Sequence, residues 1–476
     1  MSQGKKVGFY TLGCKMNFSE TSTIAREFEA GGFCRARRGE PADIYVVNSC
    51  SVTEHADKKC RNLVRRLIRE NPRALVAVTG CYAQLRPREL ASIEGVDLVV
   101  GNGDKGSLFE RIASMRSKGG TVVHGCEADE LTSFFAAFST GDRTRSFLKV
   151  QDGCDYRCSY CTIPLARGAS RNLPIADLVA EAERIAAGGR REIVLTGINT
   201  GDFGKTTGER FVDLLRALDG VRGIDRYRIS SIEPNLLSDE VIAFTAASEK
   251  FQPHFHIPIQ SGCDRILGLM RRRYNTTKFA ERIGAVRRAM PDAFLGIDVI
   301  VGFPGETDDD FARTYDFLER IEPAFLHVFP YSVRPGTPAA DLPGRVPAPV
   351  IERRAAALGE LCDRLHRAFC RSHDGRTASV LWESTRRDGR ITEYIPLKFG
   401  FNHAELRDGE LWINDKKAEL SAVDYDAAAD AAATERQLKI LKNQRVNTLC
   451  VSYPQPHWFY ELCDRIGFYV IDQANI

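Results

Sequence analysis

Three cysteines, Cys154, Cys158 and Cys161, lie on one short segment with the spacing C-x3-C-x2-C, and Tyr160 directly precedes the last of them. Three thiolates this close in sequence can ligate three irons of a [4Fe-4S] cluster and leave the fourth iron open to an outside ligand. A zinc site usually takes four ligands in C-x2-C pairs, and no second pair lies nearby. A buried apolar group is the remaining alternative. The spacing therefore favours an iron–sulfur centre.

Three further cysteines, Cys14, Cys50 and Cys81, each follow an apolar run that is typical of a β-strand. Because the carboxyl ends of parallel strands meet at one edge of a sheet, these three thiols should converge on one spot. Three unrelated buried cysteines are the alternative, which their shared placement disfavours. The strand-like runs are 6–12, 44–48 and 74–79.

The N-terminal third alternates these strand-like runs with amphipathic segments. Residues 19–31 read as a helix with Ser19 as its N-cap, and residues 56–70 read as a second helix. Strand–helix alternation of this kind predicts an α/β domain built on a doubly wound parallel sheet.

The central region, from residue 146 to about 368, repeats the β/α pattern with longer units. Six such units predict a partial TIM-type (β/α)6 barrel. The C-x3-C-x2-C loop follows the first strand, at the carboxyl end, where barrels carry their active sites. The predicted strands are 147–151, 192–196, 227–230, 254–258, 294–301 and 325–329.

Polar residues and glycines mark the ends of several of these strands. Gly197 lies in a turn whose backbone N–H groups could face an anionic ligand, while Glu233 and Gln260 follow later strands. Each feature alone is as often an ordinary turn as a site. Arg167 and Arg171 could contact substrate phosphates or belong to a solvated loop, and the sequence does not decide between these.

Bulk properties exclude several classes of protein. The 476 residues have a formal net charge of only +3, so global basicity does not indicate a nucleic-acid partner. The N-terminus lacks a signal-peptide core and no run is long enough to span a membrane, so we expect a cytoplasmic protein whose clustered cysteines serve metal chemistry. Arginine clusters, each more typical of a solvated helix face than of an RNA groove, stand at 35–38, 61–69 and 271–273.

Taken together, the cysteine motifs resemble those of the radical S-adenosylmethionine (SAM) methylthiotransferases. The resemblance rests on the 154–161 loop and on the segments 11–17, 47–53 and 78–83. It implies that Cys154, Cys158 and Cys161 hold the catalytic [4Fe-4S] cluster that binds SAM. It also implies that a second, auxiliary [4Fe-4S] cluster is held by Cys14, Cys50 and Cys81.

The resemblance further implies a SAM pocket and a substrate. Tyr160 would lie against the adenine, and Gly197, Glu233 and Gln260 would touch the amino-acid or ribose part of SAM. The segments 161–171, 195–199, 230–234 and 327–338 look like the MtaB type, which methylthiolates C2 of N6-threonylcarbamoyladenosine beside the tRNA anticodon. An electron donor such as flavodoxin or ferredoxin would be required. The alternatives are a RimO-type enzyme acting on a ribosomal-protein aspartate, or an inactive iron–sulfur protein.

The C-terminal part departs from this family. The segment 375–395 resembles only the start of the RNA-binding TRAM barrel, and from about residue 399 the chain looks like a truncated piece of a family 2 glycoside hydrolase (β-galactosidase type). Because a retaining glycosidase needs two opposed carboxylates and those of that family come later, we predict no glycosidase activity. Because an incomplete TRAM barrel would lack Lys and Arg contacts to phosphates, we expect weakened tRNA binding. The predicted domains are 1–138, 139–370, 371–398 and 399–476.

Overall fold

The chain divides into a larger unit that runs to Phe369 and a smaller unit formed by Cys370–Val380 and Leu397–Ile476. Among the described residues, no helix is long and apolar enough to cross a lipid bilayer. The computed structural model describes residues 4–37, 39–115, 120–140, 144–380, 397–400, 404–407, 410–413, 416–417, 419–426, 430–452, 455 and 457–473.

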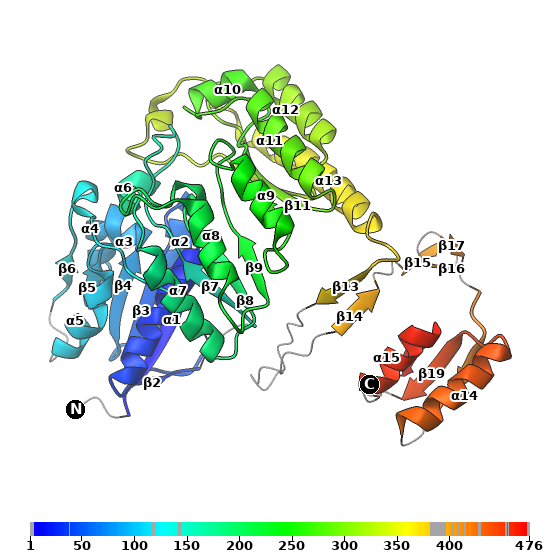
Figure 1. Ribbon diagram of the computed structural model, residues 1–476. Coiled ribbons are helices and arrows are strands. Elements are labelled where there is room, and N and C mark those ends of the chain that lie inside the picture. Colours follow the sequence, from blue (N-terminus) through cyan, green and yellow to red (C-terminus); the bar gives the residue numbers. More distant parts are fainter. Residues whose placement is uncertain are drawn as a thin grey trace. The chain divides into compact units, whose positions relative to one another are not determined.

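The N-terminal part of the larger unit is a six-stranded, wholly parallel sheet with the order β2-β1-β3-β4-β5-β6 (Figure 1). The three strands predicted from the sequence are the central ones, and the sequence did not indicate the short strands β2, β5 and β6. The strands are β1 (Lys6–Thr11), β2 (Cys34–Arg35), β3 (Ile44–Ser49), β4 (Leu75–Gly80), β5 (Leu98–Val100) and β6 (Val122–His124).

Successive residues of each strand point to opposite faces of the sheet, and here both faces are apolar. Helices therefore cover both faces. Val47 packs in one core cluster with Val64 of α2, whereas its neighbour Val46 packs in another with Ile24 of α1. This two-sided burial confirms the predicted doubly wound α/β fold. The helices are α1 (Lys15–Ala30), α2 (Glu54–Glu70), α3 (Cys81–Leu85), α4 (Pro87–Ala91) and α5 (Leu108–Ser114).

Helix α1 begins earlier than the sequence predicted, and Ser19 is not its N-cap. Cys14 is the N-cap, because Gly13 turns the chain at φ 102° directly after β1 and leaves no room for a longer loop. Ser19 lies inside the first turns and donates a hydrogen bond to the carbonyl oxygen of Met16 (2.9 Å). The Cys14 thiol therefore lies at a helix N-terminus, where it meets partial positive charge.

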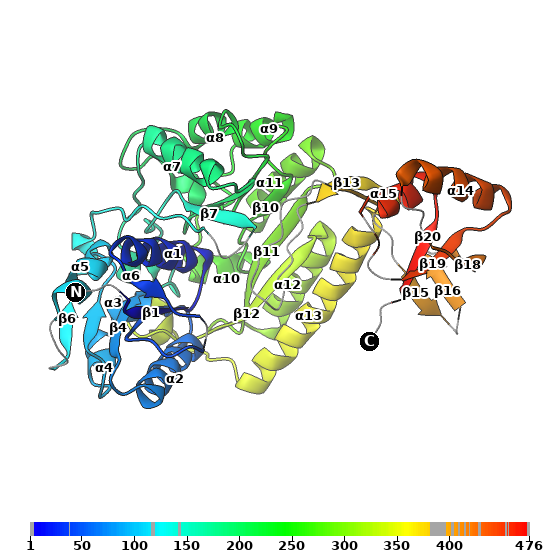
Figure 2. The ribbon, with the colours of Figure 1, turned by 90° about the horizontal axis from the view of Figure 1, so that it is seen from below.

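The central part of the larger unit is a half barrel of six parallel strands in two sheets, β7-β8-β9 and β10-β11-β12 (Figure 2). Parallel bridges from Tyr227 to Phe251 and from Ser231 to His256 join the two sheets, so the six predicted β/α units form one curved surface. The strands are β7 (Arg145–Lys149), β8 (Glu192–Thr196), β9 (Arg226–Ile229), β10 (His254–His256), β11 (Phe294–Val301) and β12 (Phe325–Pro330).

Helices bury the convex side of the half barrel in one large apolar core, which leaves the concave side for polar groups. The α-helices are α6 (Ile163–Arg167), α7 (Ile175–Ala187), α8 (Phe211–Asp219), α9 (Asp239–Ala247), α10 (Asp264–Leu269), α11 (Thr276–Ala289), α12 (Asp308–Ile321) and α13 (Ala348–Arg371). Short 3-10 helices are η1 (Lys105–Ser107), η2 (Ala128–Glu130), η3 (Thr200–Asp202) and η4 (Pro338–Asp341).

The smaller unit combines antiparallel pairs with a three-stranded parallel sheet. β13 pairs with β14, β15–β17 form a meander, and β18-β19-β20 alternate with α14 and α15. The predicted TRAM-like segment at 389–395 lies outside the described residues. The elements are β13 (Thr377–Val380), β14 (Leu397–Gly400), β15 (Ala404–Arg407), β16 (Glu410–Ile413), β17 (Lys416–Lys417), β18 (Ala422–Asp424), α14 (Ala431–Asn443), β19 (Thr448–Ser452), α15 (His457–Ile466) and β20 (Tyr469–Gln473).

The smaller unit has its own apolar core, so we expect calorimetry to resolve two unfolding transitions. Phe459 is fully buried in that core, and truncating it to alanine should cost about 3–5 kcal/mol and remove the smaller unit's transition alone. Phe255→Ala is the matched control, because Phe255 is equally buried in the half-barrel core and should shift only the other transition. A shift of both transitions by Phe459→Ala would show instead that the two units fold together.

Candidate active site

The structure brings Cys14, Cys50 and Cys81 together at the carboxyl edge of the N-terminal sheet. They follow β1, β3 and β4, which are hydrogen-bonded neighbours. Gly13 lets Cys50 approach the backbone of the first loop, since a Cβ at Gly13 would lie 2.8 Å from the Cys50 sulfur. Cys81 and Cys14 are both close enough to raise the pKa of the Cys50 thiol, after burial, which is the main cause. The predicted convergence of these three residues therefore has the geometry of one site.

Burial governs the ionisation of these thiols. It raises the pKa of Cys50 to about 12, with the nearby Cys81 adding to the effect. Burial also raises the pKa of Cys14, although the Cys14 side chain is exposed. Iron binding at these sulfurs must expel thiol protons, and it therefore becomes more favourable as the pH rises.

Arg167 supplies the positive charge that an iron–sulfur cluster here would need. Its guanidinium donates a 2.7 Å hydrogen bond to Asn17 Oδ1, and its positive charge opposes in part the rise in pKa that burial causes at Cys14 and Cys50. Its Nε is buried and has no hydrogen-bond partner among the described residues. A buried donor without a partner is costly unless a ligand accepts from it, and cluster sulfurs are such acceptors. The three cysteines and this donor fit a [4Fe-4S] cluster.

The second set of cysteines lies on the loop after β7, at the mouth of the half barrel. The backbone N–H groups of Tyr156 and Ile163 each donate to a cysteine sulfur at 3.4 Å, the first to Cys154 and the second to Cys161. Burial raises the pKa of Cys154 and of Cys161 to about 12. The loop thus presents its sulfurs in a preformed shell of N–H donors, which fits a cluster held by three thiolates.

Arg272 crosses this loop and is a site residue that sequence reasoning missed. One of its N–H groups lies 3.0 Å from the Cys158 sulfur, and its guanidinium also binds Glu233 and the Tyr274 hydroxyl (2.7 Å). Its side chain is only 2% exposed, so the predicted solvated arginine face at 271–273 is wrong at this position. The signal that could have found it is the basic run that follows the strand-end motif at Gln260, but the buried partners Cys158 and Glu233 are distant in sequence.

Of the predicted SAM-binding residues, Tyr160 belongs to this loop, and Glu233 contacts it through Arg272. Tyr160 is packed against a buried apolar cluster, and Gln260 holds a left-handed backbone with φ 72° that costs a non-glycine residue about 1 kcal/mol or more. The turn at Gly197 differs from expectation, because the N–H groups of Ile198 and Asn199 donate to the Gln151 side chain (2.9 and 3.0 Å). The roles of Tyr160, Gly197, Glu233 and Gln260 toward SAM stay predictions.

A buried ion-pair cluster joins the N-terminal sheet to the half barrel. The Glu20 carboxylate of α1 binds Lys105 (2.5 Å), Lys149 (2.9 Å) and Arg167 (2.9 Å), and all four side chains are 1% exposed. Burial alone would raise the pKa of Glu20, but Arg167, Lys105 and Lys149 outweigh it and hold that pKa well below its usual range. The cluster fixes the two cysteine sites relative to each other.

Asp152 extends this cluster into the half barrel and engages the two arginines whose role the sequence left open. It pairs with Lys149 (2.6 Å), Arg167 (3.0 Å) and Arg171 (3.3 Å). Arg167 and Arg171 are therefore buried structural cations, neither solvated loop residues nor exposed phosphate contacts. The surplus of cations over carboxylates in the cluster places net positive charge beside Cys14 and Cys50.

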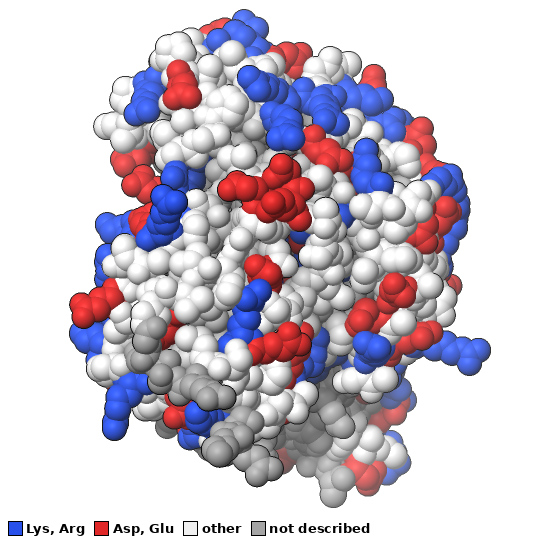
Figure 3. All heavy atoms as spheres, turned by 90° about the vertical axis from the view of Figure 1, so that its left-hand side faces the viewer, with Lys and Arg blue, Asp and Glu red and all other residues white. Residues whose placement is uncertain are grey.

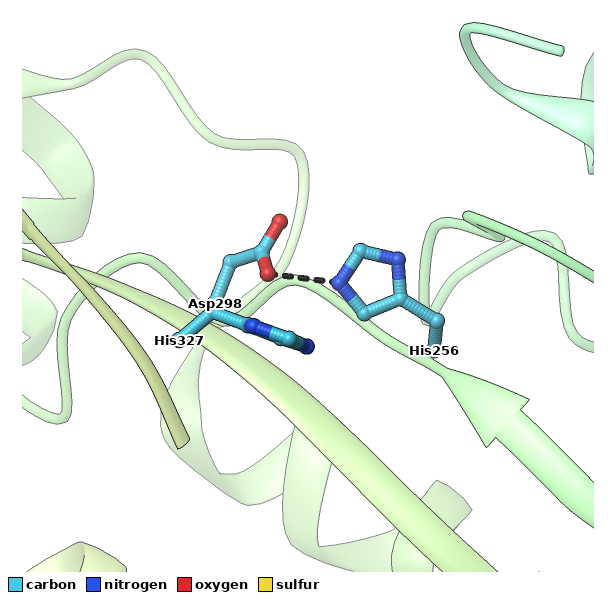
Figure 4. Close-up of side chains that lie close together, drawn as sticks. All are labelled: His256, Asp298 and His327. Carbon is cyan, nitrogen blue, oxygen red and sulfur yellow. Dashed lines mark hydrogen bonds and ion pairs between the residues drawn. The ribbon is translucent and has the colours of Figure 1, made fainter. Parts of the chain in front are cut away.

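A group of side chains outside both cysteine sets lies on the concave face of the half barrel. His256 of β10, Asp298 of β11 and His327 of β12 offer ligand atoms within 4.8 Å of one another, and Figure 4 shows both rings beside the carboxylate. His256 Nε2 lies 2.5 Å from Asp298 Oδ1, and its Nδ1 lies 2.9 Å from Ser231 Oγ. Sequence reasoning did not identify this group, because its members are spread over three strands.

The surface carries acidic and basic side chains interspersed on the face that Figure 3 shows, which agrees with the net charge of +3. A cleft of about 740 Å³ lies where α2 and α4 meet the loop after β12. Arg61, Arg86, Arg88 and Arg334 line it together with acidic residues. The cleft is therefore mixed in charge.

Family models match three stretches of the chain. Residues 6–101 match "Uncharacterized protein family UPF0004" and residues 148–318 match the "Radical SAM superfamily". Residues 404–476 match the TIM barrel domain of glycosyl hydrolases family 2. A solved structure, the radical SAM methyltransferase TsrM from Kitasatospora setae, is similar with a TM-score of 0.52 at 15% identity, over 71% of this chain and 77% of that one. The half barrel with its three-cysteine loop is thus a radical SAM fold.

Similar proteins show which family of radical SAM enzymes this chain belongs to. Threonylcarbamoyladenosine tRNA methylthiotransferase MtaB from Bacillus subtilis is 41% identical, over 79% of this chain and 84% of the relative. MtaB from Aquifex aeolicus is 37% identical over 83% and 96%. tRNA-2-methylthio-N(6)-dimethylallyladenosine synthase from Mycolicibacterium smegmatis is 34% identical over 90% and 87%. The chain belongs to the radical SAM methylthiotransferases, of the MtaB type, an enzyme family that uses SAM and [4Fe-4S] clusters.

Proposed function

We propose that this chain methylthiolates C2 of N6-threonylcarbamoyladenosine in tRNA, next to the anticodon, with two [4Fe-4S] clusters. The observation that carries the proposal is the pairing of two three-cysteine sites within one compact unit, linked by the buried Glu20–Arg167 bridge. The MtaB relatives, whose names state this modified adenosine, support the choice of substrate.

The two sites would divide the reaction between them. When bound, SAM and the clusters supply a carbon radical and the methylthio group, which acid–base chemistry could not provide at an unactivated C–H bond. The chain's own task is to hold the reacting atoms close together and to exclude water. Arg272 would orient the loop of Cys158, and the buried Glu20 cluster would keep the auxiliary site in register with it. Cys154, Cys158 and Cys161 are the proposed ligands of the SAM-binding cluster, and Cys14, Cys50 and Cys81 those of the auxiliary one.

The remaining partners follow from the chemistry. Reductive cleavage of SAM needs one electron at a time, so we expect a small donor such as flavodoxin or ferredoxin, and we expect the enzyme to act in the cytoplasm, where tRNA is modified. The target adenosine must leave its stack to enter the site, as bases in RNA loops commonly do when proteins read them.

Anaerobic reconstitution followed by nucleoside mass spectrometry tests the proposal. The full chain should bind roughly eight irons, the content of two [4Fe-4S] clusters. It should then convert N6-threonylcarbamoyladenosine in an anticodon stem-loop to its 2-methylthio form. A stem-loop that carries the dimethylallyl group instead is the matched control, because relatives named for that substrate are also similar to this chain. Product from the dimethylallyl substrate alone would replace the proposed substrate.

A further inference from the structure

The cleft between α2, α4 and the loop after β12 is fixed to the auxiliary cysteine site. Helices α2 and α4 pack on the same face of the N-terminal sheet (Figure 2). From the loop after β12, Arg334 donates a 2.7 Å hydrogen bond to the Ser51 hydroxyl. From α2, Arg61 donates a 2.6 Å hydrogen bond to the Tyr82 hydroxyl. Ser51 and Tyr82 each directly follow a cysteine of the auxiliary site, so two walls of the cleft are anchored beside its thiols.

Helix α3 sets how far the cleft lies from this site. The helix begins at Cys81, and Arg86, the residue directly after its end, lines the cleft. A helical rise of about 1.5 Å per residue places Arg86 about 7–8 Å along the helix from Cys81. A nucleotide whose base reached the auxiliary site would therefore carry its own backbone past the cleft.

Two of the three carboxylates that line the cleft are already paired within the protein. Asp57 binds Arg334 (2.6 Å), and Glu89 binds Arg61 (2.8 Å). The side chain of the third, Glu54, is exposed and has no ion-pair partner among the residues that the structure describes. The acidic side chains of the cleft therefore leave one negative charge uncompensated.

The unpaired cations outnumber this single carboxylate. Arg86 and Arg88 line the cleft and are exposed. Lys58 and Arg65 are also exposed, and they share a face of α2 with Arg61, because residues three and four apart are neighbours on a helix. Within the described part of the chain, none of these four side chains has a hydrogen-bond or ion-pair partner. Four free cations thus stand in or beside the cleft.

This arrangement suits a ligand with repeated negative charges. A guanidinium offers a fork of N–H donors that matches phosphate oxygens, and it is only weakly hydrated. A single small anion would engage one or two of the four cations, whereas a nucleic-acid strand presents one phosphate per nucleotide along its length. Because the whole chain has a net charge of only +3, the local surplus is not a reflection of general basicity.

We propose that this cleft binds the phosphodiester backbone of the tRNA anticodon loop, with Arg86 and Arg88 on phosphates next to the modified nucleotide. The assignment rests on the proposed function, which makes tRNA the substrate, and it adds the surface that holds the RNA. The basic run at 61–69 is then part of an RNA-binding face. An acidic electron-donor protein is disfavoured, because the cleft adjoins the auxiliary site and the electron must reach the other cysteine loop.

The test measures Kd by fluorescence anisotropy over a series of salt concentrations, with the reconstituted full chain. One anticodon stem-loop is unmodified and a second carries the threonylcarbamoyl group. A glutamine double variant joins Arg86→Gln to Arg88→Gln, and a lysine double variant joins Arg86→Lys to Arg88→Lys. The control double variant joins Arg222→Gln to Arg288→Gln, two exposed arginines that do not line the cleft. Iron content, measured for every variant, should match that of the wild type.

Each lost phosphate contact should reduce the slope of log K against log salt concentration by about 0.7–0.9. The glutamine double variant should therefore lose about 1.5 of this slope, and its Kd near 0.1 M salt should rise by about 10- to 100-fold. Both stem-loops should be affected equally, because phosphate contacts carry no base information. The lysine double variant keeps the charge and should keep most of the slope, and the control should keep all of it.

Three results would overturn the assignment. The glutamine double variant could bind both stem-loops as the wild type does at every salt concentration. Its loss could be confined to the threonylcarbamoyl stem-loop, which would place the arginines on the base and not on phosphates. Its RNA binding could be unchanged while its reduction by flavodoxin slows, which would make the cleft a protein-docking site.

Failure of the proposed function gives a different result. If no methylthio product forms but the salt slopes change as expected, the substrate assignment is wrong and the RNA-binding surface stands. If the wild type binds neither stem-loop, RNA is not the occupant of the cleft.

Discussion

Replacing Cys14, Cys50 and Cys81 together by alanine is expected to lower the iron content from about eight to about four atoms per chain and to abolish methylthio transfer. SAM cleavage should continue, because Cys154, Cys158 and Cys161 lie on a separate loop of the half barrel with its own N–H donors. Iron analysis, electron paramagnetic resonance and counting of 5′-deoxyadenosine against modified nucleoside measure the three quantities. We therefore expect the triple variant to lose methylthio transfer completely and to keep SAM cleavage.

A cysteine outside the two sites provides a matched control for this experiment. Cys34 is exposed on the short strand β2 and pairs with Lys6 at the start of β1, so it lies away from the carboxyl edge where the three thiols meet. Cys34→Ala should retain all the iron. If the triple variant kept about eight irons, or if it lost SAM cleavage as well, the assignment of the auxiliary ligands would be wrong.

The elements that place the cysteines could be predicted because their signals are local. Each central strand is an apolar run of five or more residues, such as Ile44–Ser49, and the cysteine that follows it is visible in the same stretch of sequence. The short strands were missed for the converse reason. β2 is only Cys34–Arg35, and both residues are exposed, so no apolar pattern marks it.

The charged residues of the site could not be predicted, because their partners are distant in sequence. Arg167 sits on a loop-like segment that reads equally as solvated or as substrate-binding. Its carboxylate partner Glu20 is 147 residues away, on the other side of the interface between sheet and half barrel. Arg272 was placed on a solvated face for the same reason, since its partner Glu233 comes from another strand end. Periodicity indicates which face of a helix is apolar, but it does not indicate which ion pairs are buried.

The substitution Glu20→Gln tests that buried bridge, and it should lower the free energy of unfolding of the larger unit by about 3–5 kcal/mol at pH 7. Lys105 is buried and has Glu20 as its ion-pair partner, so the amide would leave this ammonium without a counter-charge. Lys149 and Arg167 would still reach Asp152. Glu89→Gln, which breaks the exposed pair with Arg61, is the control and should cost less than about 1 kcal/mol.

The pH dependence of the stability difference between wild type and Glu20→Gln tests the same bridge independently. Because the folded-state pKa of Glu20 is held well below its usual range, the bridge contributes its full stability above the unfolded pKa, about 4.3, and loses it as the pH falls toward the folded value. The difference between wild type and Glu20→Gln should therefore be constant from pH 8 to about 5 and should shrink below about pH 4. Urea unfolding at a series of pH values measures it. A difference under about 1 kcal/mol at neutral pH, or one that grows on acidification, would mean that the carboxylate is protonated in the folded protein and does not hold the two cysteine sites together.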